Sequence, residues 1–417
     1  MVSLLIIAAI ILIIEYYSFI ALRKVIHRLH YRLQLSIIIP YLALTICILW
    51  GFYALHLWAD TSWPSNLIKF AVNIFVGIFI GKLLVTIIMF LGDIILIFKS
   101  IFNYLLPDKK STLGNSSAGK QQITRSEFIS KTALICGGAL ASGLAYGMTN
   151  RYDYKVRRVQ LPLQGLPGNY KGLRIAQISD IHSGSFDNSK AVSEGVEAIM
   201  QENPDLILFT GDLVNFRANE IVPYLNIFNR LQAPLGVYSI LGNHDYGDYV
   251  SWPSESAKMN DLKELQGYHK AMGWQLLMNE HMIMQQNGRQ IALIGVENWS
   301  ARARFPQYGD LKKAMSGLEN MDLPLKILMS HDPSHWDAEV RRDYPDIALT
   351  LSGHTHGMQF GIDIPGFKWS PVQYLYKQWA GLYQEKNQYL YVNRGFGFIG
   401  YQGRLGVLPE ITVIDLV

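Results

Sequence analysis

Five short polar clusters follow one another between residues 180 and 356. They contain Asp180 and His182, Asp212, Asn243 to Asp245, His331, and His354 with His356. A centre of two divalent metal ions uses such ligands, because carboxylate and amide oxygens and imidazole nitrogens bind these ions and leave positions open for water and a phosphate. The clusters therefore predict metal-dependent hydrolysis of a phosphoester.

The clusters follow short apolar runs that are rich in β-branched residues, a pattern typical of buried strands. Helical spacing occurs between them, as at Ser189 to Gln201. Because the clusters come directly after strands, we expect them at the carboxyl ends of a sheet, where α/β folds bind ligands. The predicted strands are Leu173 to Ser179, Leu206 to Thr210, Gly236 to Leu241, Ile291 to Val296, Lys326 to Met329, Ile347 to Leu351, Tyr389 to Val392 and Ile411 to Leu416.

Two of the clusters place a pair of possible ligands two residues apart. Asp180 and His182 form one pair, and His354 and His356 form the other. In an extended segment, side chains two positions apart point to the same side. On this reasoning each pair can serve one ion.

The remaining ligands come singly. Asp212 follows Gly211, which permits a close approach of neighbouring chain, so its carboxylate can bridge two ions. Asn243 offers a neutral amide oxygen. His335 lies four residues after His331 and is an alternative ligand, but His331 directly ends a strand and is preferred.

In this order and placement, the clusters resemble those of the calcineurin-like metallophosphoesterase superfamily, over roughly Leu173 to Val417. The segments that carry the resemblance are Ile178 to His182, Leu241 to Asp245, Ser330 to Pro333 and Gly353 to Gly357. They are similar to a membrane-associated bacterial branch, which includes exported phosphodiesterases and enzymes that cleave the pyrophosphate of UDP-2,3-diacylglucosamine in lipid A synthesis. The resemblance implies an α/β fold, a β-sandwich of two mixed sheets flanked by helices.

The resemblance also implies a role for each residue. His244 would be the catalytic imidazole that protonates the leaving oxygen, while Asp245 would either orient it or cap the turn. Arg394 would contact phosphate or be a solvated loop charge. A hydroxide shared by two divalent ions would attack phosphorus, and Mn, Fe and Zn suit the ligands equally. One ion would be held by Asp180, His182, Asp212 and His356, and the other by Asp212, Asn243, His331 and His354.

The first 150 residues have a different composition, and the mean hydropathy of the whole chain is +0.13. Long apolar runs there predict an all-α transmembrane region before the globular domain. We expect about three spans in residues 1–106, a basic cytoplasmic linker in 107–131, a fourth transmembrane or signal-like span in 132–149, and the metallophosphoesterase domain in 150–417.

Charges around these runs predict their orientation. Basic residues lie at Arg23 to Arg32 and at Lys109 to Lys131, whereas Ala59 to Asn66 carries Asp60 and no basic residue. Basic loops stay in the cytoplasm, so we expect an inner-membrane protein with several spans and an extracytoplasmic catalytic domain. Glu15, Lys82 and Asp93 lie inside apolar runs, and their position lets them extend to the membrane interface.

The sequence therefore predicts a membrane-anchored phosphoesterase acting on a phosphodiester or pyrophosphate that is lipid-linked. One alternative is the UDP-2,3-diacylglucosamine pyrophosphate hydrolase of lipid A biosynthesis. A catalytically silent metal-binding sensor or scaffold is another. The net charge of +4, without a basic and aromatic stripe in the globular part, argues against a nucleic-acid partner. Cys47 and Cys136 both lie in apolar runs and leave the globular part without a thiolate ligand.

Overall fold

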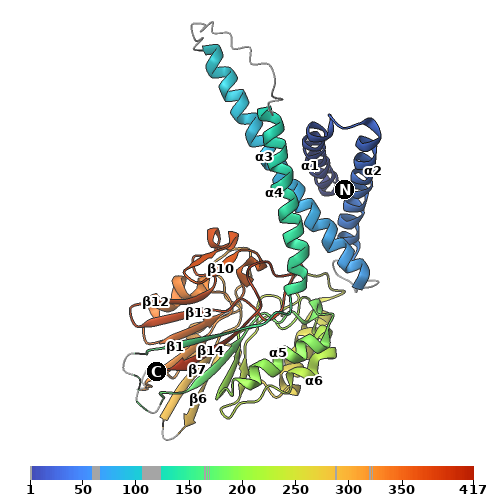
Figure 1. The fold of residues 1–417 in the computed structure, drawn as a ribbon. Helices are drawn as coiled ribbons and strands as arrows, with labels where there is room; N and C mark the ends of the chain where they lie inside the picture. The colour runs from blue at the N-terminus through green and yellow to red at the C-terminus, as the bar shows by residue number, and fades with distance from the viewer. Residues whose placement is uncertain are drawn as a thin grey trace. The chain divides into compact units, whose positions relative to one another are not determined.

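A computed structural model describes residues 2–58, 66–105, 124–163, 166, 168, 170–286, 289–318, 321 and 323–417. The chain divides into two compact units, Met1–Tyr146 and Gly147–Val417, drawn in Figure 1. The first unit is helical and the second contains both sheets. Each unit is described by itself below.

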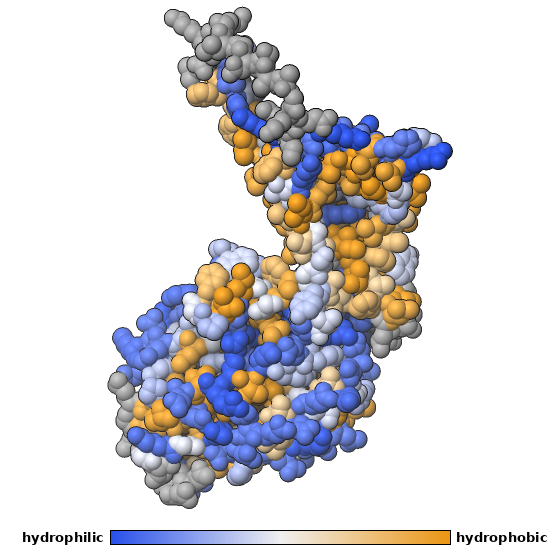
Figure 2. Space-filling model, in the orientation of Figure 1, coloured by the Kyte–Doolittle hydropathy of each residue, from blue (hydrophilic) through white to orange (hydrophobic). Residues whose placement is uncertain are grey.

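The described part of the helical unit consists of long apolar helices, whose surface is largely apolar in Figure 2. They are α1 (Val2–Ile26), α2 (Tyr31–Trp58), α3 (Asn66–Leu105) and α4 (Arg125–Gly147). By length and composition, Tyr31–Ala54, Leu67–Leu105 and Arg125–Asn150 can each cross a membrane. With 40 residues, α3 is about 60 Å long, roughly twice the thickness of the hydrocarbon layer.

The fourth helix begins earlier than the sequence pattern suggests. Because α4 starts at Arg125, the last residues of the predicted cytoplasmic linker are helical. The preceding part of that linker, 107–123, lies outside the described residues, as does most of the predicted external loop 59–66.

An ion pair between Glu15 of α1 and Lys82 of α3 lies inside the helical unit. The Lys82 Nζ atom is 2.9 and 2.7 Å from the two carboxylate oxygens, and both residues are buried. From α2, Thr45 and Tyr41 donate hydrogen bonds to the same carboxylate. The expectation that these charges extend to the interface is therefore wrong. An apolar surrounding penalises a lone charge, so the two charges satisfy each other and link three helices.

In its described residues, the second unit is built on two mixed sheets of six strands each. Their strand orders are β1-β14-β2-β3-β4-β5 and β12-β13-β9-β8-β7-β6, and a separate hairpin contains β10 and β11. In the first sheet β2 to β5 are parallel while β14 runs antiparallel to β2. This arrangement confirms the predicted α/β class with two mixed sheets.

The strands and helices of this unit have the following bounds. The first sheet contains β1 (Lys155–Leu161), β2 (Arg174–Ile178), β3 (Leu206–Phe209), β4 (Val237–Ser239), β5 (Gln275–Leu276) and β14 (Glu410–Leu416). The second contains β6 (Glu280–Gln286), β7 (Arg289–Gly295), β8 (Leu325–Met329), β9 (Leu349–Ser352), β12 (Gly381–Glu385) and β13 (Gln388–Val392). The hairpin is formed by β10 (Ile362–Ile364) and β11 (Phe367–Trp369). The helices are α5 (Ser189–Gln201), α6 (Leu225–Phe228), α7 (Glu255–Ala271), α8 (Leu311–Met315) and α9 (Arg341–Asp343).

The central strands are apolar on both faces because each face has its own core. On β3, Leu206 and Leu208 point between the sheets, where they join Ile327 of β8. The alternate residues Ile207 and Phe209 belong to the core that also contains side chains of α5 and α7. Strands covered on both faces show continuous apolar runs, which explains why the sequence pattern found them.

The predicted polar clusters follow the carboxyl ends of five strands. Asp180 comes after β2, Asp212 after β3, Asn243 after β4, His331 after β8 and His354 after β9. This placement confirms the expectation that the clusters extend beyond strand ends. The two sheets thereby deliver their polar residues to a common region.

Candidate metal centre

The loops that carry the predicted ligands have an uncommon backbone conformation. The φ angles are 53° at Asp180, 48° at His182, 61° at Asp212, 69° at His354 and 50° at His356. Side chains other than glycine seldom adopt this left-handed region, and each such residue costs about 1–3 kcal/mol. The expectation of extended pairs is therefore wrong: β2 ends at Ile178 and β9 at Ser352, so tight turns aim the side chains.

Two glycines allow these loops to approach one another closely. A Cβ atom at Gly353 would lie 1.9 Å from Ser179 Oγ and 2.2 Å from Asp180 Oδ2. At Gly211, with φ 94°, a Cβ would lie 2.6 Å from the backbone nitrogen of Gly242. Any larger residue at either position would push apart two ligand-bearing loops.

The first group of possible ligands contains Asp180, His182 and His356, all buried. His356 Nε2 lies 3.1 Å from Asp180 Oδ1 and 3.1 Å from His182 Nε2. One ligand atom from each residue lies within 4.8 Å of the others. The loops after β2 and β9 thus join to form a single ligand cluster.

The second group contains Asp212, His331 and His354. Asp212 Oδ2 is 3.2 Å from His331 Nε2 and also 3.4 Å from His182 Nε2, a member of the first group. The Asp212 carboxylate therefore lies between the two groups. It has the position that a bridging ligand requires.

Hydrogen bonds fix which nitrogen each imidazole of the second group presents. His331 Nδ1 donates to the carbonyl of Thr210 at 2.8 Å, which leaves Nε2 toward Asp212. His354 Nε2 donates to the hydroxyl of Tyr376 at 2.9 Å, which leaves Nδ1 only 3.3 Å from His331 Nε2. Outer hydrogen bonds of this kind hold metal-ligating imidazoles in place.

The chemistry of these atoms fits divalent cations. A carboxylate oxygen and two ring lone pairs converge in the second group, and such acceptors repel unless a proton or a cation lies among them. Asn243 Oδ1 is buried without a hydrogen-bond partner among the described residues. The donor set is oxygen and nitrogen only, which suits Mn, Fe or Zn.

The ionisation states are those that metal binding needs. Burial lowers the pKa of His354 and His356 and holds that of His182 well below its ordinary value, so these imidazoles are neutral. Burial raises the pKa of Asp212, but the nearby His331 and His244 lower it more, and it stays well below its usual range. Neutral imidazoles and ionised carboxylates are the forms that bind a metal.

His331 is the one imidazole of the two groups whose pKa is raised, because it faces carboxylates of the cluster. Burial lowers its pKa, but the facing Asp212 and the nearby Asp180 raise it more, to about 10. A positive charge is therefore favoured at this point of the cluster. A divalent ion would supply that charge and release the proton.

His244 lies beside the two groups and is partly exposed. Its Nδ1 donates to the carbonyl of Asn215 at 2.8 Å, so Nε2 is the nitrogen available for proton transfer. Its backbone N–H donates to Asp212 Oδ1 at 2.8 Å, and its ring centre is 5.0 Å from that of His182. The imidazole is thus tied to both groups without belonging to either.

Asp245 does not orient His244 through its carboxylate. Both oxygens are buried and accept four backbone N–H groups, from Asp212, Leu213, Val214 and Gly242, at 2.8–3.2 Å. These donors belong to the turn after β3 and the turn after β4. We therefore assign Asp245 a positioning role in place of the predicted catalytic one.

The structure argues against the phosphate-binding role predicted for Arg394. Its guanidinium is buried and forms ion pairs with Glu410 at 2.5 Å and Asp363 at 2.9 Å. The carboxylates of Glu410 and Asp363 already bind the guanidinium N–H groups that a phosphate would need. His335, the alternative ligand, bonds Ser330 and Glu339 and lies in neither group.

Arg404 is a site residue that the sequence pattern does not reveal. It is fully buried and donates to His356 Nδ1 at 3.1 Å, to the carbonyl of Arg394 at 2.7 Å and to that of Gly397. This contact holds the Nδ1 edge of the His356 ring, while Nε2 faces Asp180 and His182 in the first group. No motif marks this arginine, since its partners are mainly carbonyl groups.

Both parts of the chain match families of known proteins. Residues 173–358 match the family model of the calcineurin-like phosphoesterases, and residues 1–151 match that of a probable transmembrane domain of calcineurin-like phosphoesterases. A zebrafish (Danio rerio) transmembrane protein with metallophosphoesterase domain is 32% identical over 294 residues, covering 68% of this chain and 62% of the relative. The chain thus spans less than two thirds of that relative's length.

Two more distant similarities accompany these. The UDP-2,3-diacylglucosamine pyrophosphatase LpxG of Chlamydia muridarum is 25% identical over 340 residues, covering 69% of this chain and 97% of that protein. The solved structure of TT1561 from Thermus thermophilus is 12% identical with a TM-score of 0.34, covering 56% of this chain and 90% of the other. Since the family models match both the unit that holds the metal ligands and the helices before it, the chain belongs to the calcineurin-like phosphoesterases that carry a transmembrane domain.

Proposed function

We propose that this protein hydrolyses a phosphodiester or pyrophosphate that is presented at a membrane surface. The observation that carries the proposal is the position of Asp212 between two groups of ligands, all buried except the partly buried His354; Asp212 lies 3.2 Å from His331 and 3.4 Å from His182. When bound, two divalent ions would supply Lewis acidity toward phosphate oxygens and lower the pKa of water.

The chain's own residues would position the metal ligands and transfer the proton. Asp212 holds the two ligand groups together, and the neutral imidazoles orient their lone pairs toward the centre. His244 donates its Nδ1 proton to the carbonyl of Asn215, so in the imidazolium form the second proton is on Nε2, from which it would pass to the leaving oxygen and leave a neutral imidazole. Partial exposure of His244 lets substrate reach it.

Replacement of Asp212 by Asn tests the centre. We expect Asp212→Asn to lower the metal content, measured by elemental analysis, and to abolish nearly all hydrolysis of bis-p-nitrophenyl phosphate. Asp248→Asn is a matched control, because this carboxylate bonds Lys258 and Tyr308 outside the centre. Full activity of Asp212→Asn with metal retained would refute the bridging role.

Replacement of His244 by Asn tests the proton transfer. The variant should keep its metal and lose on the order of a hundredfold or more in kcat, with a smaller loss for esters whose leaving group needs no proton. Equal losses for good and poor leaving groups would argue against the acid role.

The name of one relative supports a second, narrower candidate. LpxG is named as a UDP-2,3-diacylglucosamine pyrophosphatase, and its similarity extends over nearly its whole length. Purified protein should therefore be assayed against phosphomonoesters, phosphodiesters and UDP-linked lipids. Metal-loaded protein that cleaves none of them would favour the sensor or scaffold alternative.

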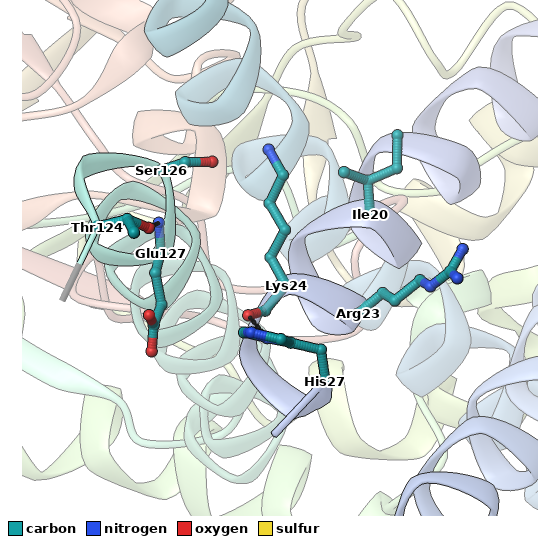
Figure 3. Close-up of a pocket in the computed structure, with 7 residues that line it drawn as sticks. All are labelled: Ile20, Arg23, Lys24, His27, Thr124, Ser126 and Glu127. Atoms are coloured by element: carbon teal, nitrogen blue, oxygen red, sulfur yellow. Dashed lines mark hydrogen bonds between the residues drawn. The ribbon is translucent and has the colours of Figure 1, made fainter. Parts of the chain in front are cut away.

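The helical unit supports an extracytoplasmic position for the catalytic unit. The end of α1 and the start of α4 line one cavity of about 410 Å³, shown in Figure 3. Arg28 pairs with Glu127 at 3.2 Å, so these two helix ends lie on one side of the membrane. Arg23, Lys24 and Arg28 make that side basic, which favours the cytoplasm.

From this side α4 leads the chain across the membrane to the catalytic unit. Protease added to intact spheroplasts should then cleave the catalytic unit. Complete protection until lysis would reverse the orientation and favour a cytoplasmic substrate.

A further inference from the structure

A group of exposed apolar side chains lies on the β10–β11 hairpin and the turn that follows it. Ile362, Ile364, Phe367, Tyr374 and Leu375 are each between 45% and 75% exposed, and we call them the hairpin face. In Figure 2 apolar surface is visible where Figure 1 shows β10. Single exposed apolar residues are ordinary, but a contiguous group of this size indicates a binding surface.

The hairpin face is attached directly to the loop that carries His354 and His356. Ser370, which follows β11, donates to the carbonyl of Gly357 at 2.8 Å. Thr355 donates to the carbonyl of Trp379 at 2.7 Å, and Tyr376 accepts the bond from His354. Hydrogen bonds from the residues that flank the hairpin face therefore hold the loop that carries two of the metal ligands.

The same hairpin lies beside the residue at which the chain enters this unit. Gly147, the last residue of α4, accepts a hydrogen bond from the backbone of Arg404 at 2.8 Å. The adjacent Leu405 accepts one from Gly361, the residue before β10, at 2.9 Å. Gly147 belongs to the C-terminal end of the candidate span Arg125–Asn150, so two backbone hydrogen bonds connect the residues before the hairpin to the last residues of that span.

The charges around the hairpin face suit a membrane with anionic lipids. Lys377 is exposed and has no described partner, while Lys368 lies over the rings of Trp379 and Tyr383. The carboxylate of Asp363, the acidic residue of β10, is neutralised by Arg394 and Arg157. Lys368 also donates to the carbonyl of Ala380 and to the hydroxyl of Tyr383, so Lys377 is the lysine available to a lipid headgroup. Apolar side chains with aromatic rings and a lysine at their edge are typical of surfaces that lie in the bilayer interface.

We propose that the hairpin face docks on the bilayer interface and holds the metal centre at the level of lipid phosphate groups. This inference rests on the proposed function and makes it narrower, because it assigns the substrate class as phosphoesters of membrane lipids. A water-soluble ester needs no such contact. The docked surface raises the local concentration of a lipid-borne ester at the centre.

Fluorescence of a labelled cysteine tests docking without any turnover. In full-length protein with Cys47 and Cys136 replaced by Ser, Ile364→Cys is labelled with an environment-sensitive nitrobenzoxadiazole dye. The protein is reconstituted in vesicles of phosphatidylcholine and phosphatidylglycerol. Met259→Cys on α7 is the matched control, since Met259 is 53% exposed and Ile364 58%.

We expect blue-shifted emission at position 364, with quenching by nitroxide-labelled lipid, and water-like emission at position 259. Water-like emission without quenching at both positions would overturn the docking proposal, whatever the activity.

A rate comparison tests the substrate class. The double variant Ile364→Ser and Phe367→Ser in vesicles should cleave an acyl-chain p-nitrophenyl phosphodiester on the order of tenfold more slowly than wild type. Both proteins should cleave soluble bis-p-nitrophenyl phosphate equally, and Met259→Ser should match wild type on both esters.

The possible failures are distinguishable. Equal rates of variant and wild type on the lipid ester overturn the inference alone, because hydrolysis itself persists. A metal-loaded wild type that cleaves neither ester contradicts the proposed function, while the fluorescence result still decides docking.

Discussion

Replacing Asp245 by Asn should separate the positioning of the metal ligands from their chemistry. Oδ1 of Asp245 accepts from Leu213 and Val214, and Oδ2 accepts from Asp212 and Gly242. Asparagine keeps one oxygen and turns an NH2 group toward the other two donors. Two buried N–H groups then lose their acceptor, whichever way the amide is oriented.

The cost follows from those two groups. Each unsatisfied buried donor costs about 1–3 kcal/mol, so the free energy of unfolding should fall by about 2–6 kcal/mol. For a unit of this size, 1 kcal/mol corresponds to roughly 2–4 °C in Tm, so the expected decrease is about 4–24 °C. Asp212 should also move, because its backbone N–H is one of the four donors.

Thermal unfolding of the full-length protein in detergent is the measurement, followed with and without added Mn²⁺ and combined with elemental analysis. Asp248→Asn is the control for loss of a negative charge. The carboxylate of Asp248 lies in the same region, but it binds the side chains of Lys258 and Tyr308 and no backbone amide of the turns. An Asp245→Asn protein with wild-type Tm and metal content would refute the reasoning, since the loss of two buried hydrogen bonds would then cost nothing.

Three further perturbations follow from buried groups. Burial raises the pKa of Glu220 from 4.5 to about 7, so the stability due to its bound proton is complete below about pH 4.5 and is lost as the pH rises through 7. Glu220→Gln should therefore exceed wild type in Tm at alkaline pH and lose this advantage in acid; a constant difference would contradict the shift. Lys82→Met should lower Tm in detergent more than the double variant with Glu15→Leu, because the single change leaves a buried charge unpaired; equal losses would show that the pair does not matter. Gly353→Ala should reduce metal content, because its Cβ would meet Ser179 Oγ at 1.9 Å, and normal metal content would show that the loops can separate.

The donor chemistry of the centre could be predicted from the sequence because it depends on residue type and on strand ends. A continuous apolar run marks β3, whose two faces are both buried, while Lys326 interrupts the run of β8 and Thr350 and Ser352 interrupt that of β9. The structure gathers Asp180, His182 and His356 in one group and Asp212, His331 and His354 in another, while the assignment of Asn243 and of a shared Asp212 stays a prediction. Period-two reasoning failed only within Asp180–His182 and His354–His356, where the chain turns at the point where an extended segment was expected.

Three strands have no hydrophobic pattern from which they could be predicted. The edge strand β1 carries Lys155, Arg157 and Arg158 and is half-exposed, so it lacks an apolar pattern. The hairpin strands β10 and β11 have three residues each, too few for a period. The local sequence does not indicate that their apolar side chains are exposed.

The two arginines of the C-terminal loop show why partners are harder to predict than ligands. Arg394 and Arg404 are equally available to a phosphate in sequence terms, yet each is buried on groups remote in the chain. Arg394 pairs with Glu410 and Asp363, and Arg404 binds His356. Such pairings depend on the packing of β14 and the hairpin, which a single sequence does not reveal.

These buried polar residues also explain how a strained centre persists. Five ligand positions in the left-handed region cost several kcal/mol in total, so isolated loops would relax into other turns. Asp245 fastens the turn after β3 to the turn after β4, and Arg404 fastens His356 to the carbonyls of the C-terminal loop. The strain is thus offset by charge-assisted hydrogen bonds that touch no substrate. Loss of either anchor should therefore disorder the ligands first and reduce turnover only as a consequence.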